Sequence, residues 1–125
     1  MARLFREVGD APWFSAGCVV AIGAFDGVHR GHQRLLAGAR ARAARDHLTP
    51  GALSFEPLPR EYFARNRGEP PAPPAPARPK FELLRDAGMV AVGLLRFNDA
   101  LASMSAGEFV ERILVGALRA HAVFV

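Results

Sequence analysis

The sequence predicts a single α/β domain built around a parallel sheet, and three observations support this fold class. Short apolar runs rich in β-branched residues alternate along the 125 residues with segments whose apolar residues recur at helical spacing. Half of the residues are hydrophobic, which is enough to bury a sizeable core. No apolar run reaches the ~20 residues of a membrane span, so we expect no contact with a membrane.

The first unit of this pattern is a strand followed by a helix. An apolar run between two glycines predicts a buried strand at residues 18–22, whereas residues 1–16 show no clear period and hold at most one short strand. A helix is expected at residues 32–47, because its apolar residues form one stripe and its arginines lie largely off it. The stripe consists of Leu35, Leu36, Ala39 and Ala43. The Thr-Pro-Gly at residues 49–51 is expected to end the unit.

Proline dominates the middle of the chain. A second short strand is expected at residues 52–55, and the Glu-Pro-Leu-Pro-Arg that follows contains two prolines, which argue against both a helix and a central strand. Residues 61–66 have room for one helical turn. Residues 69–79 form a proline-rich surface loop. A helix at residues 80–87, which Gly88 caps, then precedes an apolar third strand at residues 89–95.

The C-terminal part repeats the pattern of helix and strand. Ser105 and Glu108 form a capping box that opens a helix at residues 106–120. Its inward side chains are Phe109, Ile113, Leu114 and Leu118. Residues 122–125 begin a fourth strand. Strands that alternate with helices imply right-handed crossovers, so we expect a Rossmann-like three-layer sandwich with a parallel sheet, incomplete at its C-terminal end.

Charge and cysteine content indicate which partners and which cellular compartment to expect. The net charge is +4 and the isoelectric point about 10.5, but only one of the 16 basic residues is a lysine, Lys80. The arginines are scattered and do not alternate with aromatic residues, so no nucleic-acid partner is expected. The single Cys18 excludes a disulfide within the chain, and the N-terminus resembles no signal peptide. We therefore expect a soluble cytoplasmic protein in which Cys18 is a buried apolar residue.

The turn at residues 23–32 carries the chemistry. It joins the first strand to the first helix, which in a doubly wound fold lies at the carboxyl edge of the sheet. Its glycines permit tight turns, and the free N–H groups of the helix N-terminus attract anions. His29 and His32 are spaced i, i+3 and can donate hydrogen bonds to phosphate oxygens. The pattern favours a site for nucleotide phosphates.

Two other interpretations of this turn have less support. Two histidines can begin a zinc site, but we find no third and fourth ligand at suitable spacing. The turn is not a Walker loop, because it contains no Gly-Lys-Ser/Thr. We therefore expect no metal ligand among the protein side chains.

The full string Gly23-Ala-Phe-Asp-Gly-Val-His-Arg-Gly-His-Gln33 resembles the signature of nucleotidyltransferases with a His-x-Gly-His motif. Its form is similar to that of the prokaryotic FAD synthetases, which are bifunctional riboflavin kinase/FMN adenylyltransferases. Three later segments agree with this resemblance, which runs from about Val19 to the last residue. They are the Leu-Ser-Phe-Glu-Pro-Leu-Pro-Arg-Glu-Tyr-Phe string at 53–63, the Lys-x-x-x-Leu-x-x-x-Gly string at 80–88, and the segments at 97–98 and 104–114.

The resemblance implies a reaction and a set of residues. ATP and FMN would give FAD and pyrophosphate, with Mg²⁺ on the phosphates. His29 and His32 would contact the ATP phosphates, and four further residues would shape that pocket, namely Gly23, Phe25, Asp26 and Gly31. The FMN site would be bordered by Phe55, Pro57 and Pro59. From the residues alone, the two phenylalanines are more typical of core residues, and the two prolines are more typical of a turn that ends a strand. The Asp26 carboxylate is typical of an acceptor for backbone N–H groups.

The chain also departs from the family pattern. A Gly-x-Asp/Asn-Phe-x-Phe-Gly loop, an Ile-Ser-Ser-Thr-x-x-Arg segment and the riboflavin kinase domain are absent, and Asn98 stands where Asp is common. We therefore expect a partial FMN adenylyltransferase domain with impaired or no activity. A non-catalytic nucleotide-binding fragment and another enzyme of the His-x-Gly-His class, such as a cytidylyltransferase, remain alternatives. The sequence leaves the oligomeric state open.

Overall fold

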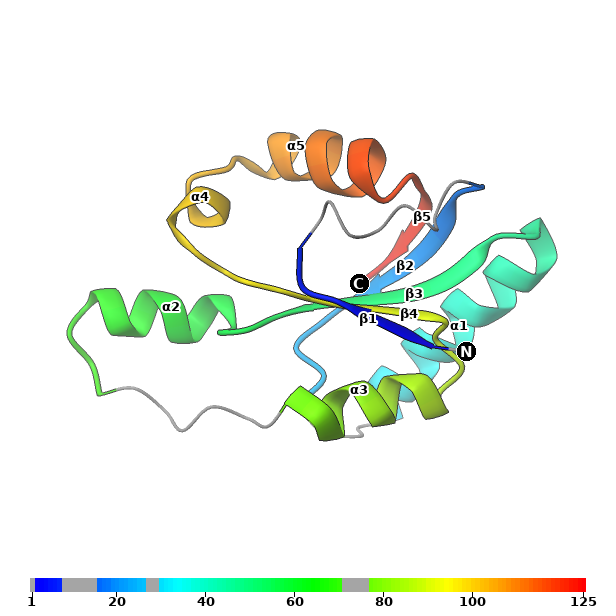
Figure 1. Cartoon of the computed structure of the whole chain (residues 1–125), viewed down its shortest axis with the longest axis horizontal. Coiled ribbons are helices and arrows are strands. Elements are labelled where there is room, and N and C mark those ends of the chain that lie inside the picture. Colours follow the sequence, from blue (N-terminus) through cyan, green and yellow to red (C-terminus); the bar gives the residue numbers. More distant parts are fainter. Residues whose placement is uncertain (1, 8–15, 27–29, 71–76) are drawn as a thin grey trace.

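The computed structural model describes residues 2–7, 16–26, 30–70 and 77–125. Within these ranges the chain forms a five-stranded sheet in the order β1-β4-β3-β2-β5, with every neighbouring pair parallel (Figure 1). The strands are β1 (Arg3–Phe5), β2 (Cys18–Ile22), β3 (Thr49–Phe55), β4 (Ala91–Leu95) and β5 (Ala120–Phe124). The predicted parallel α/β fold is therefore confirmed.

Helices cover both faces of the sheet and make three layers (Figure 1). In β2 the side chains alternate, so that Cys18 and Val20 join one buried cluster while Val19 and Ala21 join the other. The second cluster is closed by α1 (Arg30–Asp46) through its predicted apolar stripe and by α3 (Ala77–Asp86) through Leu84. The first is closed by the C-terminal helix.

The strand order places a topological switch point between β2 and β5. From β2 the chain moves through α1 to β3 and through α3 to β4 on one side, whereas β5 adds to the other side of β2. Helices that leave the sheet on opposite sides of such a point open a crevice at the carboxyl ends of the strands, where open α/β sheets bind ligands. The turn that follows β2 begins at this crevice.

Two boundaries differ from the sequence expectation near the first crossover. Helix α1 begins at Arg30, two residues earlier than expected. Strand β3 begins at Thr49, so Pro50 and Gly51 belong to the strand and do not end the unit. Pro50 is tolerated because it lies at the start of the strand, before the pairing of β3 with β4 begins at Gly51.

A short helix follows each of the strands β3 and β4. Helix α2 (Pro59–Asn66) begins at a proline that was expected to forbid a helix; at the first helical position its missing N–H would have no partner in any case. Helix α4 (Asp99–Ala102) was not predicted. Its N-cap is Asn98, whose Oδ1 accepts a hydrogen bond from the Leu101 N–H at 3.1 Å. Asn and Asp cap helices equally well, so the departure at Asn98 costs little.

The C-terminal helix confirms its predicted start and inward face. The side chain of Ser105 accepts a hydrogen bond from the Glu108 N–H at 3.1 Å, and the Glu108 side chain accepts one from the Ser105 N–H. The helix runs as α5 (Ala106–Phe109) and then in wider π-helical turns as η3 (Val110–Ala117). It ends earlier than expected, because Arg119 adopts a positive φ of 54° and turns the chain into β5.

Cys18 provides a test of the buried sheet. Its side chain is fully buried, its Sγ donates to the Leu118 carbonyl at 3.2 Å, and burial raises the pKa of the thiol to about 12. We expect iodoacetamide to leave native Cys18 unmodified at pH 8 and to alkylate it in urea, as followed by mass spectrometry. Because the folded pKa lies above the unfolded value of 9.0, the stabilisation from the neutral thiol should be complete below pH 9 and decline from pH 9 to 12. Rapid labelling of the native protein would contradict this burial.

Candidate functional site

The turn after β2 is fastened to the neighbouring strand. The Gly23 N–H donates to the Leu53 carbonyl at 3.2 Å, and the space above Gly23 is filled by an aromatic ring, since a Cβ there would lie 3.1 Å from Phe25 Cζ. Gly31, in the first turn of α1, faces open space: a Cβ would meet no atom of the described residues within 4 Å. This leaves room for close approach of a ligand to the helix N-terminus. His29 lies outside the described residues.

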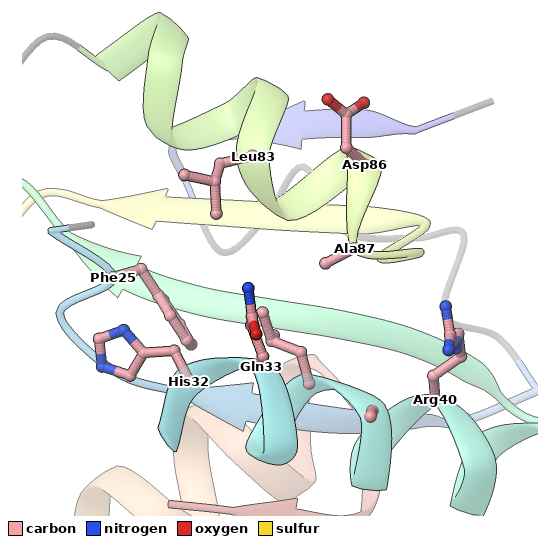
Figure 2. Close-up of a pocket in the computed structure, with 9 residues that line it drawn as sticks. Phe25, His32, Gln33, Arg40, Leu83, Asp86 and Ala87 are labelled. Atoms are coloured by element: carbon pink, nitrogen blue, oxygen red, sulfur yellow. The ribbon is translucent and has the colours of Figure 1, made fainter. Parts of the chain in front are cut away.

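Phe25 belongs to the core under the turn. Its side chain is 2% exposed, and its backbone has a positive φ of 50°, which is uncommon for a residue with a side chain. The ring meets that of His32 in a T-shaped contact, with centroids 5.2 Å apart and planes at 65° (Figure 2). The Phe25 ring thus contributes to the position of the imidazole.

His32 stands at the rim of a cavity between α1 and α3. The cavity has a volume of about 440 Å³, and its apolar lining includes Phe25, Leu36 and Leu83. Figure 2 shows Gln33 and Arg40 rising from α1 into the same gap, while the Asp86 carboxylate on α3 points away from it. The half-buried imidazole therefore borders both the turn and this cavity.

The Asp26 carboxylate has two cationic partners from distant parts of the sequence. Its Oδ2 accepts a hydrogen bond from an Arg60 guanidinium nitrogen at 2.8 Å, and its Oδ1 lies 3.8 Å from Lys80 Nζ. Arg60 comes from α2 and Lys80 from α3. These contacts tie the turn to both helices. Sequence analysis did not place Arg60 or Lys80 in the site, because nothing local relates them to Asp26.

The second predicted turn, after β3, lies next to the first. Its Glu56–Pro57 peptide bond is cis, Leu58 is buried, and Pro59 begins α2. The hydroxyl of buried Ser54 donates to the Ala24 carbonyl at 3.1 Å and so joins the two turns. A hollow of about 190 Å³ lies between them. It is lined by Ala24, Phe55, Leu58, Pro59 and Arg60.

Phe55 also borders a second hollow, of about 280 Å³. Its ring makes a T-shaped contact with Phe97, with centroids 5.7 Å apart, and a tilted contact with Phe109 at 6.2 Å. Phe97 and Phe109 stood in segments that carried the family resemblance, but neither was predicted as a site residue. Aromatic rings and apolar side chains here form a surface suited to a flat heterocycle.

Tyr62 fixes α2 beside this aromatic surface. Its ring packs edge-on against Phe97, with centroids 5.2 Å apart, and its hydroxyl donates to the Asp99 carboxylate. This hydrogen bond raises the pKa of Tyr62 above the ordinary value for a tyrosine. Since ionisation is opposed, Tyr62 remains a neutral donor at physiological pH and links α2 to α4.

The described residues contain neither a cluster of metal-binding side chains nor a membrane-spanning helix. Within residues 2–7, 16–26, 30–70 and 77–125, no three His, Cys, Asp or Glu side chains gather in a group that could hold a metal ion. In the described part of the chain, no helix combines the length and apolar character needed to cross a membrane.

The fold and site define a class of protein. A parallel sheet with a glycine-rich turn at its switch point, followed by a helix in whose first turn Gly31 faces open space, agrees with the architecture of a Rossmann-like nucleotidyltransferase. Residues 11–125 match the family model of FAD synthetase. The chain therefore belongs to the FAD synthetase family.

Individual relatives agree with this assignment. The bifunctional riboflavin kinase/FMN adenylyltransferase of Pseudomonas fluorescens is 46% identical over 108 residues, which cover 82% of this chain and 32% of that protein. The protein of the same name from Escherichia coli K12 is 39% identical over 95% of this chain and 37% of its own length. The one from Bacillus subtilis is 32% identical over 86% and 34%. The chain spans about a third of the length of the curated relatives it matches.

A solved structure shares the fold. The crystal structure of a macrolide-efflux protein from Streptococcus pneumoniae superimposes with a TM-score of 0.75 at 27% sequence identity. The match covers 98% of this chain and 41% of that one. It supports the Rossmann-like architecture over nearly the whole length of the chain.

Proposed function

We propose that this chain carries the adenylyl-transfer site of an FMN adenylyltransferase. An oxygen of the FMN phosphate attacks the α-phosphorus of ATP. The bond between that phosphorus and the oxygen that bridges it to the β-phosphorus breaks, and FAD and pyrophosphate result. The observation that carries the proposal is the pairing of two turns: the first turn, described at residues 23–26, and the turn at 55–59 follow adjacent strands, and residues of both line one hollow. One is suited to phosphate and the other to a flat ring.

ATP would bind at the first turn. The open space over Gly31 supports access of the triphosphate to the free N–H groups of α1, and we assign His32 the role of donating a hydrogen bond to a phosphate oxygen. We assign His29 the same role. We assign Gly23 and Phe25 a role in shaping this pocket, since Gly23 is covered by Phe25 and the Phe25 ring contacts His32. Asp26 would shape it by tying the turn to α2 and α3 through Arg60 and Lys80.

The FMN side uses the second turn. Phe55 borders both hollows. A flavin ring packed against Phe97 and Phe109 in the larger hollow would therefore direct its ribityl chain over Pro59, through the smaller hollow, toward the first turn. The prolines keep this wall stiff, because Pro57 and Pro59 each have a fixed φ. Phe55, Pro57 and Pro59 are the residues to which we assign flavin contact.

Mg²⁺ enters this scheme as part of the substrate. The Asp26 carboxylate of the first turn is already paired with Arg60 and Lys80, which supports a metal held by the ATP phosphates. Bound there, Mg²⁺ would neutralise charge on the phosphates.

The test is direct synthesis of FAD. The purified chain is incubated with FMN and Mg-ATP, FAD is separated by chromatography, and pyrophosphate is measured by a coupled assay. Any FAD that forms should be matched by an equal amount of pyrophosphate, at the impaired rate expected of a partial domain, and none should form when CTP replaces ATP or riboflavin replaces FMN. Binding of both substrates without any FAD would favour a nucleotide-binding fragment. Transfer to an alcohol phosphate but not to FMN would favour another enzyme of the His-x-Gly-His class.

A further inference from the structure

The cluster of Asp26, Arg60 and Lys80 joins three segments at the edge of the site. The residues stand on the first turn, on α2 and on α3, and they meet only because the crossovers bring those elements together (Figure 1). Two cations share one carboxylate, so the cluster carries a formal charge of plus one. An excess of positive charge beside a nucleotide site can accept a phosphate.

The Arg60–Asp26 pair is easily opened. Its distance is 2.8 Å, but the Arg60 side chain is 74% exposed and that of Asp26 is 35% exposed. Exposed ion pairs of this kind contribute little to stability, because solvent screens them and ordering the side chains opposes them. A phosphate dianion offers the guanidinium two acceptor oxygens and more charge than a carboxylate. Arg60 can therefore exchange Asp26 for a phosphate at low cost.

Lys80 is held differently. Its side chain is only 9% exposed, and its Nζ lies 3.8 Å from Asp26 Oδ1, which is an ion-pair distance longer than a hydrogen bond. A largely buried ammonium is stabilised by opposite charge together with hydrogen-bond acceptors. At 3.8 Å, Asp26 supplies Lys80 with opposite charge but with no hydrogen-bond acceptor. An incoming phosphate can supply both the charge and the acceptor.

The position of Arg60 indicates which phosphate this is. Arg60 lines the hollow between the two turns together with Phe55 and Pro59, the residues assigned to flavin contact. It follows Pro59 directly in α2, whose first residues extend from the flavin wall. A phosphate at Arg60 thus lies at the end of a flavin's ribityl chain, and it faces the turn where ATP would react.

Resting on the proposed function, we propose that Arg60 and Lys80 bind the 5′-phosphate of FMN, and that the Asp26 carboxylate occupies the position of that phosphate before FMN arrives. Arg60 and Lys80 then make the site select FMN over riboflavin, which has no phosphate. It also offsets the repulsion between the FMN phosphate and the triphosphate of ATP during their approach.

The test compares ligands with and without the phosphate. Quenching of flavin fluorescence gives the affinities of the chain for FMN and for riboflavin, and a parallel calorimetric titration compares ATP with adenosine. We expect Arg60→Gln and Lys80→Met each to reduce the preference for FMN over riboflavin by about tenfold, the size of a lost charge-assisted contact. Riboflavin binding and the preference for ATP over adenosine should not change. The matched control is Arg65→Gln, an exposed arginine on the same helix, which should alter neither preference.

The Asp26→Asn variant tests the competition itself. Because the carboxylate no longer competes for Arg60 and Lys80, FMN should bind several-fold more tightly while riboflavin binds as before. A residue with only a structural role would weaken both flavins alike.

Three results would overturn the assignment. They are an unchanged preference for FMN in Arg60→Gln, a loss of the preference for ATP instead, and no binding of FMN to the wild-type chain. Arg60 is exposed, so Arg60→Gln should remain folded even if Lys80→Met does not. Binding is measured without turnover, so an absence of FAD synthesis would count against the proposed function and leave this test intact.

Discussion

For the proposed adenylyl transfer, replacing His32 with asparagine is expected to slow FAD formation by about 100- to 1,000-fold, the usual effect of removing one preorganised donor to a developing negative charge. The imidazole is half-buried, stands in the first turn of α1, and is held by the Phe25 ring at 5.2 Å. The loss should appear in kcat more than in the KM for ATP, because the donor acts as charge builds on the phosphates. Steady-state rates with FMN and Mg-ATP measure both.

His47→Asn is the matched control for this prediction. His47 directly follows the other end of α1, is exposed, and has a positive φ of 56°, which asparagine tolerates well. The same substitution there should leave the rate of FAD formation within about twofold, since it touches no part of the site. Equal losses in the two variants, or a rise in KM alone for His32→Asn, would contradict a role for His32 in the transition state.

Replacing Phe25 with alanine is expected to lower the free energy of unfolding by about 3–5 kcal/mol, as is usual when a buried aromatic ring is removed. The ring is 2% exposed and packs in the cluster under α1 and α3. Its removal also deprives Gly23 and His32 of the surface against which they rest. Urea unfolding followed by circular dichroism gives the free energy.

Two further variants check the cause. Phe63→Ala removes a ring that is 44% exposed and should cost clearly less than Phe25→Ala. Phe25→Gly removes the same ring but relieves the positive φ of 50°, so it should be about 1 kcal/mol more stable than Phe25→Ala. If Phe25→Ala were as stable as the wild type, the ring would have no place in the core, and Phe25 would have to be considered as a ligand contact alone.

Most of the secondary structure followed from local chemistry. The strand at residues 18–22, the apolar stripe of α1, the cap at Gly88 and the capping box at Ser105 were all predicted and are all present. The misses lie where local rules compete. Pro59 was interpreted as a helix breaker although it begins α2, and the strand at Thr49 was cut short by a Pro-Gly signal that pairing with β2 overrides.

The candidate site was predicted in part. Residues 23–26 lie at the switch point as expected, Phe55 and Pro59 share a hollow with Ala24, and residues 27–29 lie outside the described residues. The ligand roles of these residues, and of His29 and His32, stay predictions. Sequence analysis did not find the Asp26 cluster or the ring contacts of Phe97 and Phe109, because each pairs residues from different crossovers.

The sequence by itself determined the family resemblance, the alternation of strands and helices along most of the chain, and the glycine-rich turn after the strand at 18–22, because each is encoded in a continuous stretch of residues. Only the tertiary structure decided the sheet order β1-β4-β3-β2-β5 and the meeting of Asp26 with Arg60 and Lys80. The physical reason is that side-chain contacts across 34 or more positions depend on which strands pair and on which face each helix packs. Sequence spacing alone does not contain that information.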